Sequence, residues 1–380
     1  MPNKYKQSLA LHKKYGGKLQ IKSKVPIKSR RDLSLAYTPG VAEVSRAVAA
    51  NAKLAKVYTL KKNSVAIVSD GSAVLGLGNI GPYGAIPVME GKAVLFKEFA
   101  NVDAWPICLD TQDMEGIIIA IKRIAPVFGG INLEDISAPR CFEIEKRLQK
   151  ELTIPVLHDD QHGTGVVVLA ALINALKIRR LDKNKARVVV NGAGAGGIGV
   201  TELLLAYGFK HITMCDSQGI IYQGRPSLNA AKINIAKRTN KNKEKGDLKD
   251  ALRGADVFIG LSGPRLVTAD MIRAMNQKPI IFAMANPEPE ILPNLAKRAG
   301  AFIVATGRSD FPNQVNNVLA FPGIFRGALD NNVRQITAKM LIAAAQNLAR
   351  LVKKPDQNNI LPSPFDKRVA PAVARAIKAR

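Results

Sequence analysis

The chain has 380 residues, which suits two domains, and its 47% hydrophobic and 23% charged residues are typical of a globular enzyme. The formal net charge is +26, from 56 Lys and Arg residues against 30 Asp and Glu residues. Such a charge attracts phosphate and anionic lipid without specificity. The basic residues are nevertheless spread over both ends and the middle, without interleaved aromatic residues or a nucleic-acid-binding motif. We therefore favour a solvated basic surface, and a nucleic-acid partner is the less favoured alternative.

The apolar segments and the cysteines argue against a membrane or exported protein. The longest apolar stretch, residues 165–176, is too short to span a bilayer and suits a buried helix. The N-terminal residues lack an apolar core followed by a small-residue cleavage site. The three cysteines, Cys108, Cys141 and Cys215, are unclustered and odd in number, which favours reduced thiols. We expect a cytoplasmic location and no membrane partner.

The predicted elements alternate between strands and helices along the chain. In the N-terminal third, apolar runs that end in an acid and an amphipathic segment predict strands at 64–70 and 104–110 and a helix at 114–126. The middle predicts a helix at 164–177, followed by buried strands at 211–216, 255–263, 279–287 and 301–307. The C-terminal residues predict a helix at 333–351 and a terminal helix from Pro371. This alternation is typical of α/β folds with parallel sheets.

A glycine-rich turn follows the β-branched run Val188–Val190. Gly192, Gly194 and Gly197 have the G-x-G-x-x-G spacing, and an amphipathic helix follows at 200–207. The first glycine permits a tight turn, the second lets the backbone approach a pyrophosphate, and the third packs the helix on the strand. The turn therefore predicts a dinucleotide site, with contacts from Gly192, Gly194, Ala195, Gly197 and Ile198.

Asp216 ends the next predicted strand, nineteen residues after Gly197. A carboxylate there accepts hydrogen bonds from the ribose hydroxyls and repels a 2′-phosphate, which favours NAD over NADP. NADP stays open as an alternative, because Lys210, Gln218 or Arg225 could accommodate the phosphate.

Two acidic pairs, Glu134-Asp135 and Asp159-Asp160, could hold a hard divalent cation such as Mn²⁺ or Mg²⁺. Taken alone they could equally be helix N-caps or solvated turns. His158 and His162 flank the second pair at a spacing that would suit zinc on a helix. We do not favour zinc, because the residues at 161–163 are expected to form a loop that enters a helix.

Several ordered blocks together resemble the short bacterial and archaeal malic enzymes. The resemblance extends from about Leu11 to the C-terminus, and its motifs are YTPGVA (37–42), the segment 69–100, LEDISAPRCFEIE (133–145), HDDQHGTG (158–165), ANPEPEI (285–291) and the segment 307–330. It implies oxidative decarboxylation of L-malate to pyruvate and CO₂ with NAD or NADP and a divalent metal, together with decarboxylation of oxaloacetate. It also implies a homodimer.

The resemblance further assigns roles to individual residues. It implies that Glu134, Asp135 and Asp160 bind Mn²⁺ or Mg²⁺. Lys92 resembles the general base of the family, with Asp159 beside it. Tyr37 resembles the general acid. We expect burial and the metal to lower the pKa of Lys92 towards neutrality, so that it can accept a proton.

Asn286 and Asn317 resemble the amides that hold the substrate carboxylates next to the cofactor. Each of the functional residues also has an ordinary alternative: a surface lysine, a tyrosine packed on a turn, or an asparagine in a turn or cap. One departure concerns the substrate, because longer malic enzymes have an arginine two residues beyond an Asp-Gly pair, whereas this chain has Asp70-Gly71-Ser72-Ala73. We expect Ser72 and backbone N–H groups to bind the substrate carboxylate instead.

The expected architecture is α/β. It comprises an N-terminal α/β substrate and catalytic domain (1–158), a Rossmann-type doubly wound NAD-binding domain (159–332) and C-terminal helices (333–380) that pack back. Two alternatives stay open. One is a 2-hydroxyacid or amino-acid dehydrogenase without decarboxylation, which would need no metal. The other is a basic nucleic-acid-binding protein with a vestigial fold.

Overall fold

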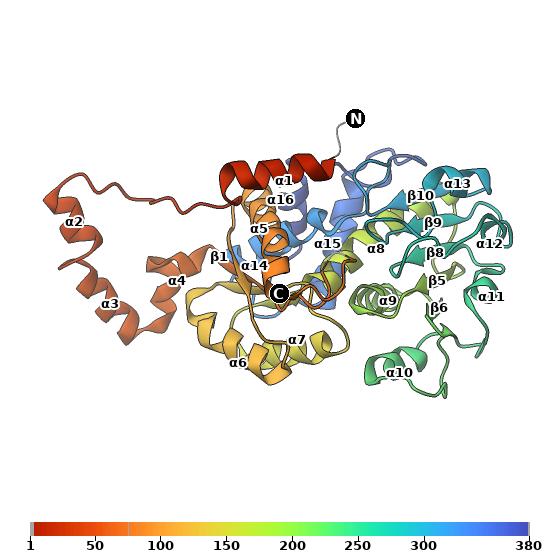
Figure 1. The fold of residues 1–380 in the computed structure, drawn as a ribbon, viewed down its shortest axis with the longest axis horizontal. Coiled ribbons are helices and arrows are strands. Elements are labelled where there is room, and N and C mark those ends of the chain that lie inside the picture. Colours follow the sequence, from red (N-terminus) through yellow and green to blue (C-terminus); the bar gives the residue numbers. More distant parts are fainter. Residues whose placement is uncertain (1–3, 75, 379–380) are drawn as a thin grey trace.

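A parallel β-sheet and a second, mainly parallel β-sheet organise the chain. The long helix α8 (Asp159–Arg179) follows the last strand of the first sheet and continues into the second half (Figure 1). The computed structural model describes residues 4–74 and 76–378. The α/β class and the Rossmann-type second half predicted from the sequence are confirmed.

The first sheet has four parallel strands in the order β2-β1-β3-β4. Alternate residues of β1 face opposite ways: Val65 and Ile67 join the core cluster that includes α5, whereas Ala66 and Val68 join the cluster that includes α6 and α7. Helices therefore cover both faces, as a buried parallel sheet requires. The elements are β1 (Ser64–Ser69), α5 (Gly81–Ala100), β2 (Asp103–Cys108), α6 (Met114–Ile124), η3 (Ala125–Val127), β3 (Gly130–Leu133), α7 (Arg140–Glu151) and β4 (Val156–His158).

The second sheet has the order β10-β9-β8-β5-β6-β7, in which only β7 is antiparallel. Its strand order reverses at β5, which is the switch point where doubly wound sheets bind ligands. The elements are β5 (Arg187–Asn191), α9 (Ala195–Tyr207), β6 (His211–Asp216), β7 (Gly219–Ile220), α10 (Ala230–Ala236), α11 (Leu248–Leu252), β8 (Val257–Gly260), α12 (Ala269–Arg273), β9 (Ile280–Ala283), α13 (Pro293–Arg298) and β10 (Ile303–Thr306).

Helix α8 is a core helix. Within residues 4–74 and 76–378 it is the one helix long and apolar enough to cross a membrane, but 72% of its apolar window is buried inside the protein. It begins at Asp159, earlier than the predicted residue 164, so the loop predicted at 161–163 is wrong. Asp159 and Asp160 lie in its first turn, where negative charge is stabilised by the helix dipole.

The C-terminal helices pack back on the N-terminal half, as predicted: α14 and α16 contact α5, and α15 contacts α8. The predicted helix at 333–351 begins later, at Ala338, because the Thr337 side chain accepts a hydrogen bond from the N–H of Met340 and caps the helix. The exact domain limits stay a prediction. The elements are η4 (Asn317–Leu319), α14 (Phe321–Asp330), α15 (Ala338–Arg350) and α16 (Val369–Ala374).

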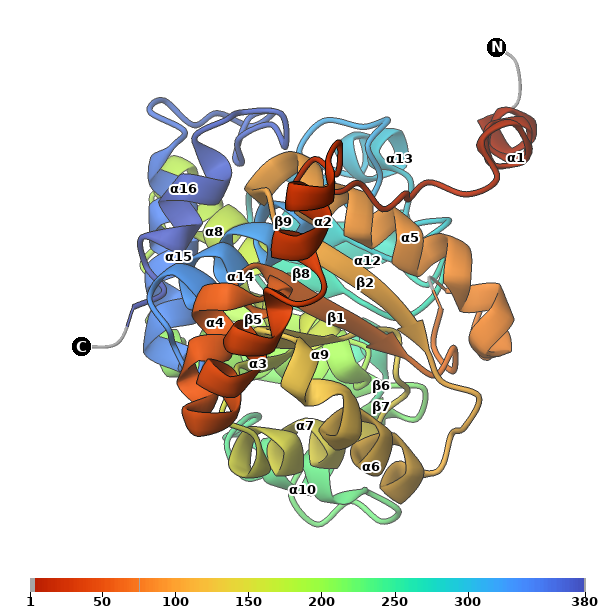
Figure 2. The same cartoon turned by 90° about the vertical axis from the view of Figure 1, so that its left-hand side faces the viewer.

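The N-terminal elements form an exposed arm. Figure 1 shows α2, α3 and α4 extending away from both sheets, and in Figure 2 they project in front of the molecule. None of these helices contains a buried residue. We call residues 30–62 the N-terminal arm. The elements that precede the first sheet are α1 (Lys4–Tyr15), α2 (Arg30–Ala36), α3 (Val41–Ala50), η1 (Ala52–Leu54), α4 (Ala55–Tyr58) and η2 (Leu60–Lys62).

Candidate active site

Polar residues gather where the strands of the first sheet end. Glu134 and Asp135 follow β3, and Asp159 and Asp160 follow β4, which is paired in parallel with β3. Because the carboxyl ends of neighbouring parallel strands lie side by side, the two acidic pairs come together at this end of the sheet. We call these four residues the carboxylate cluster.

Lys92, from the middle of α5, reaches into this cluster. Its Nζ lies 2.5 Å from Oδ2 of Asp159, forms an ion pair with Glu134 and lies 4.5 Å from the centre of the Phe321 ring. The Lys92 side chain is only 7% exposed. A buried ammonium is costly unless it is paired, so Lys92 is no ordinary surface lysine. The predicted contact between Lys92 and Asp159 is present.

The charges in the cluster change the expected proton affinity of Lys92. Burial lowers the pKa of Lys92, but the carboxylates of Asp159, Glu134 and Asp160 outweigh burial and raise that pKa. The predicted lowering of the Lys92 pKa depends on a bound metal as well as on burial, so it stays a prediction for the metal-bound site. Burial in turn raises the pKa of Glu134 and that of Asp159, each to about 7. Three carboxylates, those of Asp159, Glu134 and Asp160, act on one ammonium, so the cluster carries excess negative charge.

The predicted metal ligands are close enough to share one cation. A carboxylate oxygen from each of Glu134, Asp135 and Asp160 lies within 4.8 Å of the others. The N–H of Asp135 also donates to Oδ2 of Asp160 at 2.9 Å, which ties the two loops together. An all-oxygen set with excess negative charge fits a hard divalent cation such as Mn²⁺ or Mg²⁺.

The two predicted substrate amides lie in different places. Nδ2 of Asn317 donates to Oδ2 of Asp159 at 2.7 Å, so Asn317 belongs to the cluster. Asn286 is exposed in the loop after β9, where a Cβ on Gly76 would lie 2.1 Å from its carbonyl oxygen. Gly76 has a φ of +72° and belongs to the loop after β1. Asn286 thus lies where a loop from the first half meets the second half.

Ser72 has structural partners that the sequence did not reveal. Its Oγ donates to Oδ1 of Asp70 at 2.5 Å and accepts from the N–H of Ser137 at 2.9 Å. The positive charge beside it comes from Arg140, whose Nη2 lies 2.6 Å from the other oxygen of Asp70. Hydrogen bonding to a substrate would have to compete with these contacts, so the role of Ser72 stays a prediction.

Tyr37 is not brought to the cluster. It is the C-cap of α2 in the N-terminal arm, and its side chain is 65% exposed. Figure 1 shows α2 well separated from α5 and α8. A general acid must reach the reacting atoms, so the predicted role of Tyr37 cannot be performed within one chain in this arrangement.

A buried glutamate that sequence reasoning missed holds the start of α8. Glu145 of α7 accepts hydrogen bonds from the N–H of His158 at 2.8 Å, from Gln161 at 3.0 Å and from His162 at 3.0 Å. Burial raises the pKa of Glu145, but His162 and His158 together outweigh burial and lower it. The loop that disfavoured zinc is absent, but among the described residues the acidic group placed to share a cation includes neither His158 nor His162, so zinc is still not favoured. Phe321 was also missed; neither residue has a spacing signal that could have found it.

The glycine turn follows β5 and lies at the switch point of the second sheet. Gly192 has a φ of +115°, and a Cβ on Gly197 would lie 1.7 Å from the Gly192 carbonyl oxygen, so both positions require glycine. Gly192 and Gly194 line a cavity of about 660 Å³ together with Asp216. The position of Ile198 differs from the cofactor contact that we predicted for it. Its side chain is buried in the core and its N–H donates to the Gly194 carbonyl, so it is not available to a cofactor.

The carboxylate of Asp216 is already held by two cations. Arg225 donates to both oxygens at 2.9 and 2.5 Å, and Lys232 of α10 donates at 2.6 Å. Burial raises the pKa of Asp216, but these hydrogen bonds outweigh burial and lower it to about 2. Lys232 lines the cavity, whereas Lys210 lies at the opposite end of β6. Lys210 is thus not placed to contact a 2′-phosphate in this cavity, whereas Lys232 lies in it.

Comparisons with known proteins cover nearly the whole chain. Residues 16–149 match the model of the malic enzyme N-terminal domain, and residues 161–378 match that of the malic enzyme NAD binding domain. The bifunctional malic/malolactic enzyme of Bacillus subtilis is 56% identical, over 98% of this chain and 91% of its own length. The NAD-dependent malic enzyme of Geobacillus stearothermophilus is 55% identical, over 95% of this chain and 76% of its own length. The NADP-dependent malic enzyme of Rhizobium meliloti is 49% identical, over 95% of this chain and 50% of its own length.

Solved structures agree with these sequence matches. The NAD-dependent malic enzyme of Thermotoga maritima has a TM-score of 0.95 and 52% identity, covering 98% of this chain and 99% of that one. The malic enzyme of Pyrococcus horikoshii has a TM-score of 0.94 and 46% identity, covering 99% of this chain and 90% of that one. The similarity therefore includes both sheets and the helices that connect them.

Proposed function

The chain belongs to the malic enzyme family, and from this premise we propose that it oxidatively decarboxylates L-malate to pyruvate and CO₂ while reducing NAD. The observation that supports this most directly is the buried contact between Lys92 and the carboxylate cluster. A dehydrogenase that transferred only hydride would not need this metal-binding set beside its base. The same cluster would decarboxylate oxaloacetate.

In the proposed reaction, Lys92 accepts the proton of the C2 hydroxyl. Asp159, itself held by a hydrogen bond from Asn317, fixes the position of the Lys92 Nζ. Bound Mn²⁺ or Mg²⁺ would polarise the substrate oxygens and neutralise the carboxylates that hold Lys92 protonated, and NAD would accept the hydride. Glu134, Asp135 and Asp160 would hold the metal. Asn286 would orient the substrate next to the cofactor from the second half of the chain.

The test is reduction of NAD and of NADP with L-malate, with Mn²⁺ or with a chelator. We expect Mn²⁺-dependent reduction and release of pyruvate, with NAD preferred. Absence of reduction with either cofactor would overturn the proposed activity, and reduction without pyruvate would favour the simple dehydrogenase.

We also propose that two copies form a homodimer through the N-terminal arm. The arm exposes many large apolar side chains, namely Leu33, Leu35, Tyr37, Val57, Tyr58 and Leu60. Such a concentration of exposed apolar surface usually marks a protein interface. A second copy is the occupant we favour, because it would also bring Tyr37 to an active site. Light scattering should give twice the chain mass of 41.0 kDa; a monomer would contradict the proposal.

A cytoplasmic location is proposed as well. Its support is the free state of Cys108, Cys141 and Cys215, two of which are buried. Fractionation of cells that make the protein tests it, and recovery outside the cytoplasm would contradict it.

A further inference from the structure

A second cavity lies at the amino ends of the strands of the second sheet, opposite to the carboxyl ends where the glycine turn lies. It has a volume of about 300 Å³ and opens at the amino ends of β5 and β6. Arg187 and His211, the first residues of these strands, are direct partners in the parallel register. The strands thus bring two chain segments that are distant in sequence to one place. We call this cavity the basic pocket.

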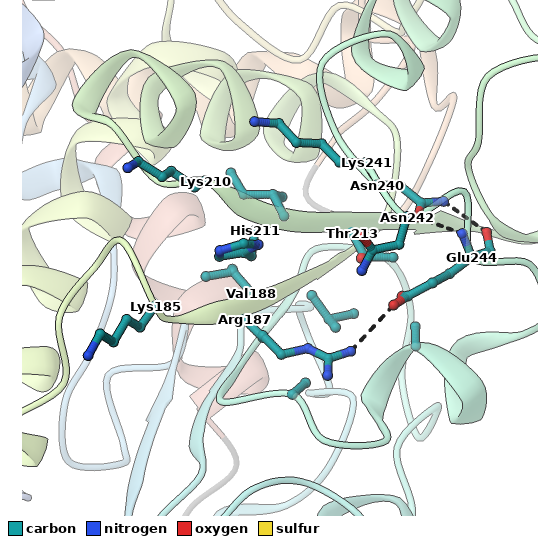
Figure 3. A pocket seen from close by; sticks show the side chains of 14 residues that line it. Lys185, Arg187, Val188, Lys210, His211, Thr213, Asn240, Lys241, Asn242 and Glu244 are labelled. Carbon is teal, nitrogen blue, oxygen red and sulfur yellow. Dashed lines mark hydrogen bonds and ion pairs between the residues drawn. The ribbon is translucent and has the colours of Figure 1, made fainter.

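The basic pocket has a strong excess of positive charge. Lys185, Arg187, Lys210 and Lys241 line it, and the one carboxylate in its lining belongs to Glu244. Oε1 of Glu244 lies 3.5 Å from Nη2 of Arg187, a long contact for an ion pair. Figure 3 shows His211 between Lys185 and Arg187 on one side and Lys210 and Lys241 on the other. Four cations against one anion leave a local excess of three positive charges.

This arrangement follows from the fold rather than from the general basicity of the surface. Lys185 and Lys210 each precede a strand by one or two residues, so the register of β5 and β6 fixes where their backbones lie. Lys241 comes from the turn after α10, whose Asn240 is buried and donates to the carbonyl of Glu244 at 2.8 Å. Three segments connected through the sheet therefore place cationic residues around one concave surface, although the amino groups of Lys185, Lys210 and Lys241 point outward in Figure 3. A cluster of cations around a concave surface raises the electrostatic potential there and favours an anion with several charges.

We propose that the basic pocket binds a small organic polyanion that carries two or more phosphate or carboxylate groups. Lys and Arg are the usual partners of both groups, and the two Asn side chains in the lining, Asn240 and Asn242, could add neutral hydrogen bonds. The volume suits a small metabolite. The site is separate from the cofactor cavity, because it lies at the amino ends of the strands whose carboxyl ends lead to Gly192 and Asp216.

The test is isothermal titration calorimetry of the full chain at fixed ionic strength, with pyrophosphate and with citrate as probes and without added divalent metal. The pocket variant is Lys185→Gln/Lys210→Gln. The matched control is Lys177→Gln/Lys339→Gln, which removes the same charge at two exposed positions outside the pocket. All four lysines are exposed, so each variant should keep the Tm of the unmodified chain. Lys241→Gln gives an independent single change if the double variant unfolds.

We expect saturable binding of at least one probe that weakens tenfold or more in the pocket variant and less than twofold in the control. Binding of pyrophosphate alone would identify a phosphorylated ligand, and binding of citrate alone a polycarboxylate. A probe that binds at the glycine turn should bind both variants equally well, and this result distinguishes such binding from binding in the basic pocket. Failure of both probes to saturate, or equal weakening in the two variants, would overturn the proposal and leave only a solvated basic surface.

Discussion

Lys92 shows how a single residue acquires a function from its surroundings. The same side chain on a surface would be a solvated cation. Here it lies within hydrogen-bond distance of Asp159 and against Phe321, with almost no contact with solvent. Its proton affinity is set by how many of the neighbouring carboxylates carry uncompensated charge. A divalent cation bound by those carboxylates would reduce their hold on the proton of Lys92.

Replacement of this residue should stop turnover without preventing metal binding. We expect Lys92→Ala to lower kcat for malate oxidation by about a hundredfold or more, as loss of a general base usually does. Lys97→Ala on the same helix is the control, because Lys97 is half exposed and pairs with Asp103 away from the cluster. Steady-state kinetics and Mn²⁺ titration measure the two properties. A Lys92→Ala enzyme with near-normal turnover would refute the base assignment.

Lys232 should decide how well NADP is used. It lies in the cofactor cavity on the Asp216 carboxylate, so its removal makes the local charge more negative where a 2′-phosphate would lie. We expect Lys232→Gln to lower kcat/KM for NADP about fivefold or more, because each phosphate contact from a cation contributes about 1 kcal/mol or more. The value for NAD should change less than twofold. An equal loss with both cofactors would show that Lys232 only supports Asp216.

At the scale of elements, the central parallel strands and the glycine turn were predictable because they depend on local patterns. Runs of β-branched residues and the G-x-G-x-x-G spacing identify them without knowledge of the rest of the chain. The start of α8 was not predictable in this way. Gly163 and the polar residues before it are typical of a loop, yet Glu145, from another helix, satisfies the polar groups of the first turn. Only the folded chain brings that partner near.

Glu145 should therefore be a positioning residue for the catalytic end of α8. Glu145→Ala removes the acceptor for three buried or half-buried donors, and we expect the free energy of unfolding to fall by about 2 kcal/mol. The affinity for Mn²⁺ should fall too, because Asp160 lies in the turn that loosens. Glu143→Ala on the exposed face of the same helix is the control. Chemical denaturation and Mn²⁺ titration provide the two measurements, and an unchanged metal affinity would contradict the positioning role.

At the scale of the whole molecule, one predicted site residue, Tyr37, lies apart from the others in the same chain. The sequence placed Lys92, Asp159 and the metal ligands in one functional group, and the structure brings all of them together. Tyr37 belongs to the same predicted group but lies on the N-terminal arm. Sequence motifs do not specify whether a residue acts within its own chain or in another copy. The apolar surface of the arm favours the second arrangement.

Mixing of two inactive variants distinguishes whether Tyr37 acts in the site of its own chain or in the site of a second copy. If Tyr37 acts in the site of a second copy, Tyr37→Phe and Lys92→Ala chains should complement each other when dimers are dissociated and reassembled. Half of the dimers would be mixed, each with one intact site, so activity should recover to roughly a quarter of the unmodified level. Without exchange of Tyr37 between copies, no mixed dimer has an intact site and activity should not recover.

We propose that this chain couples metal-dependent oxidation of malate to loss of CO₂ at the carboxylate cluster. The most direct measurement is the ratio of pyruvate to NADH formed from L-malate, for the unmodified enzyme and for Asp160→Asn, each with saturating Mn²⁺. We predict one pyruvate per NADH for the unmodified enzyme, and loss of both products in Asp160→Asn without loss of the folded state. NADH without pyruvate, or undiminished turnover in Asp160→Asn, would contradict it.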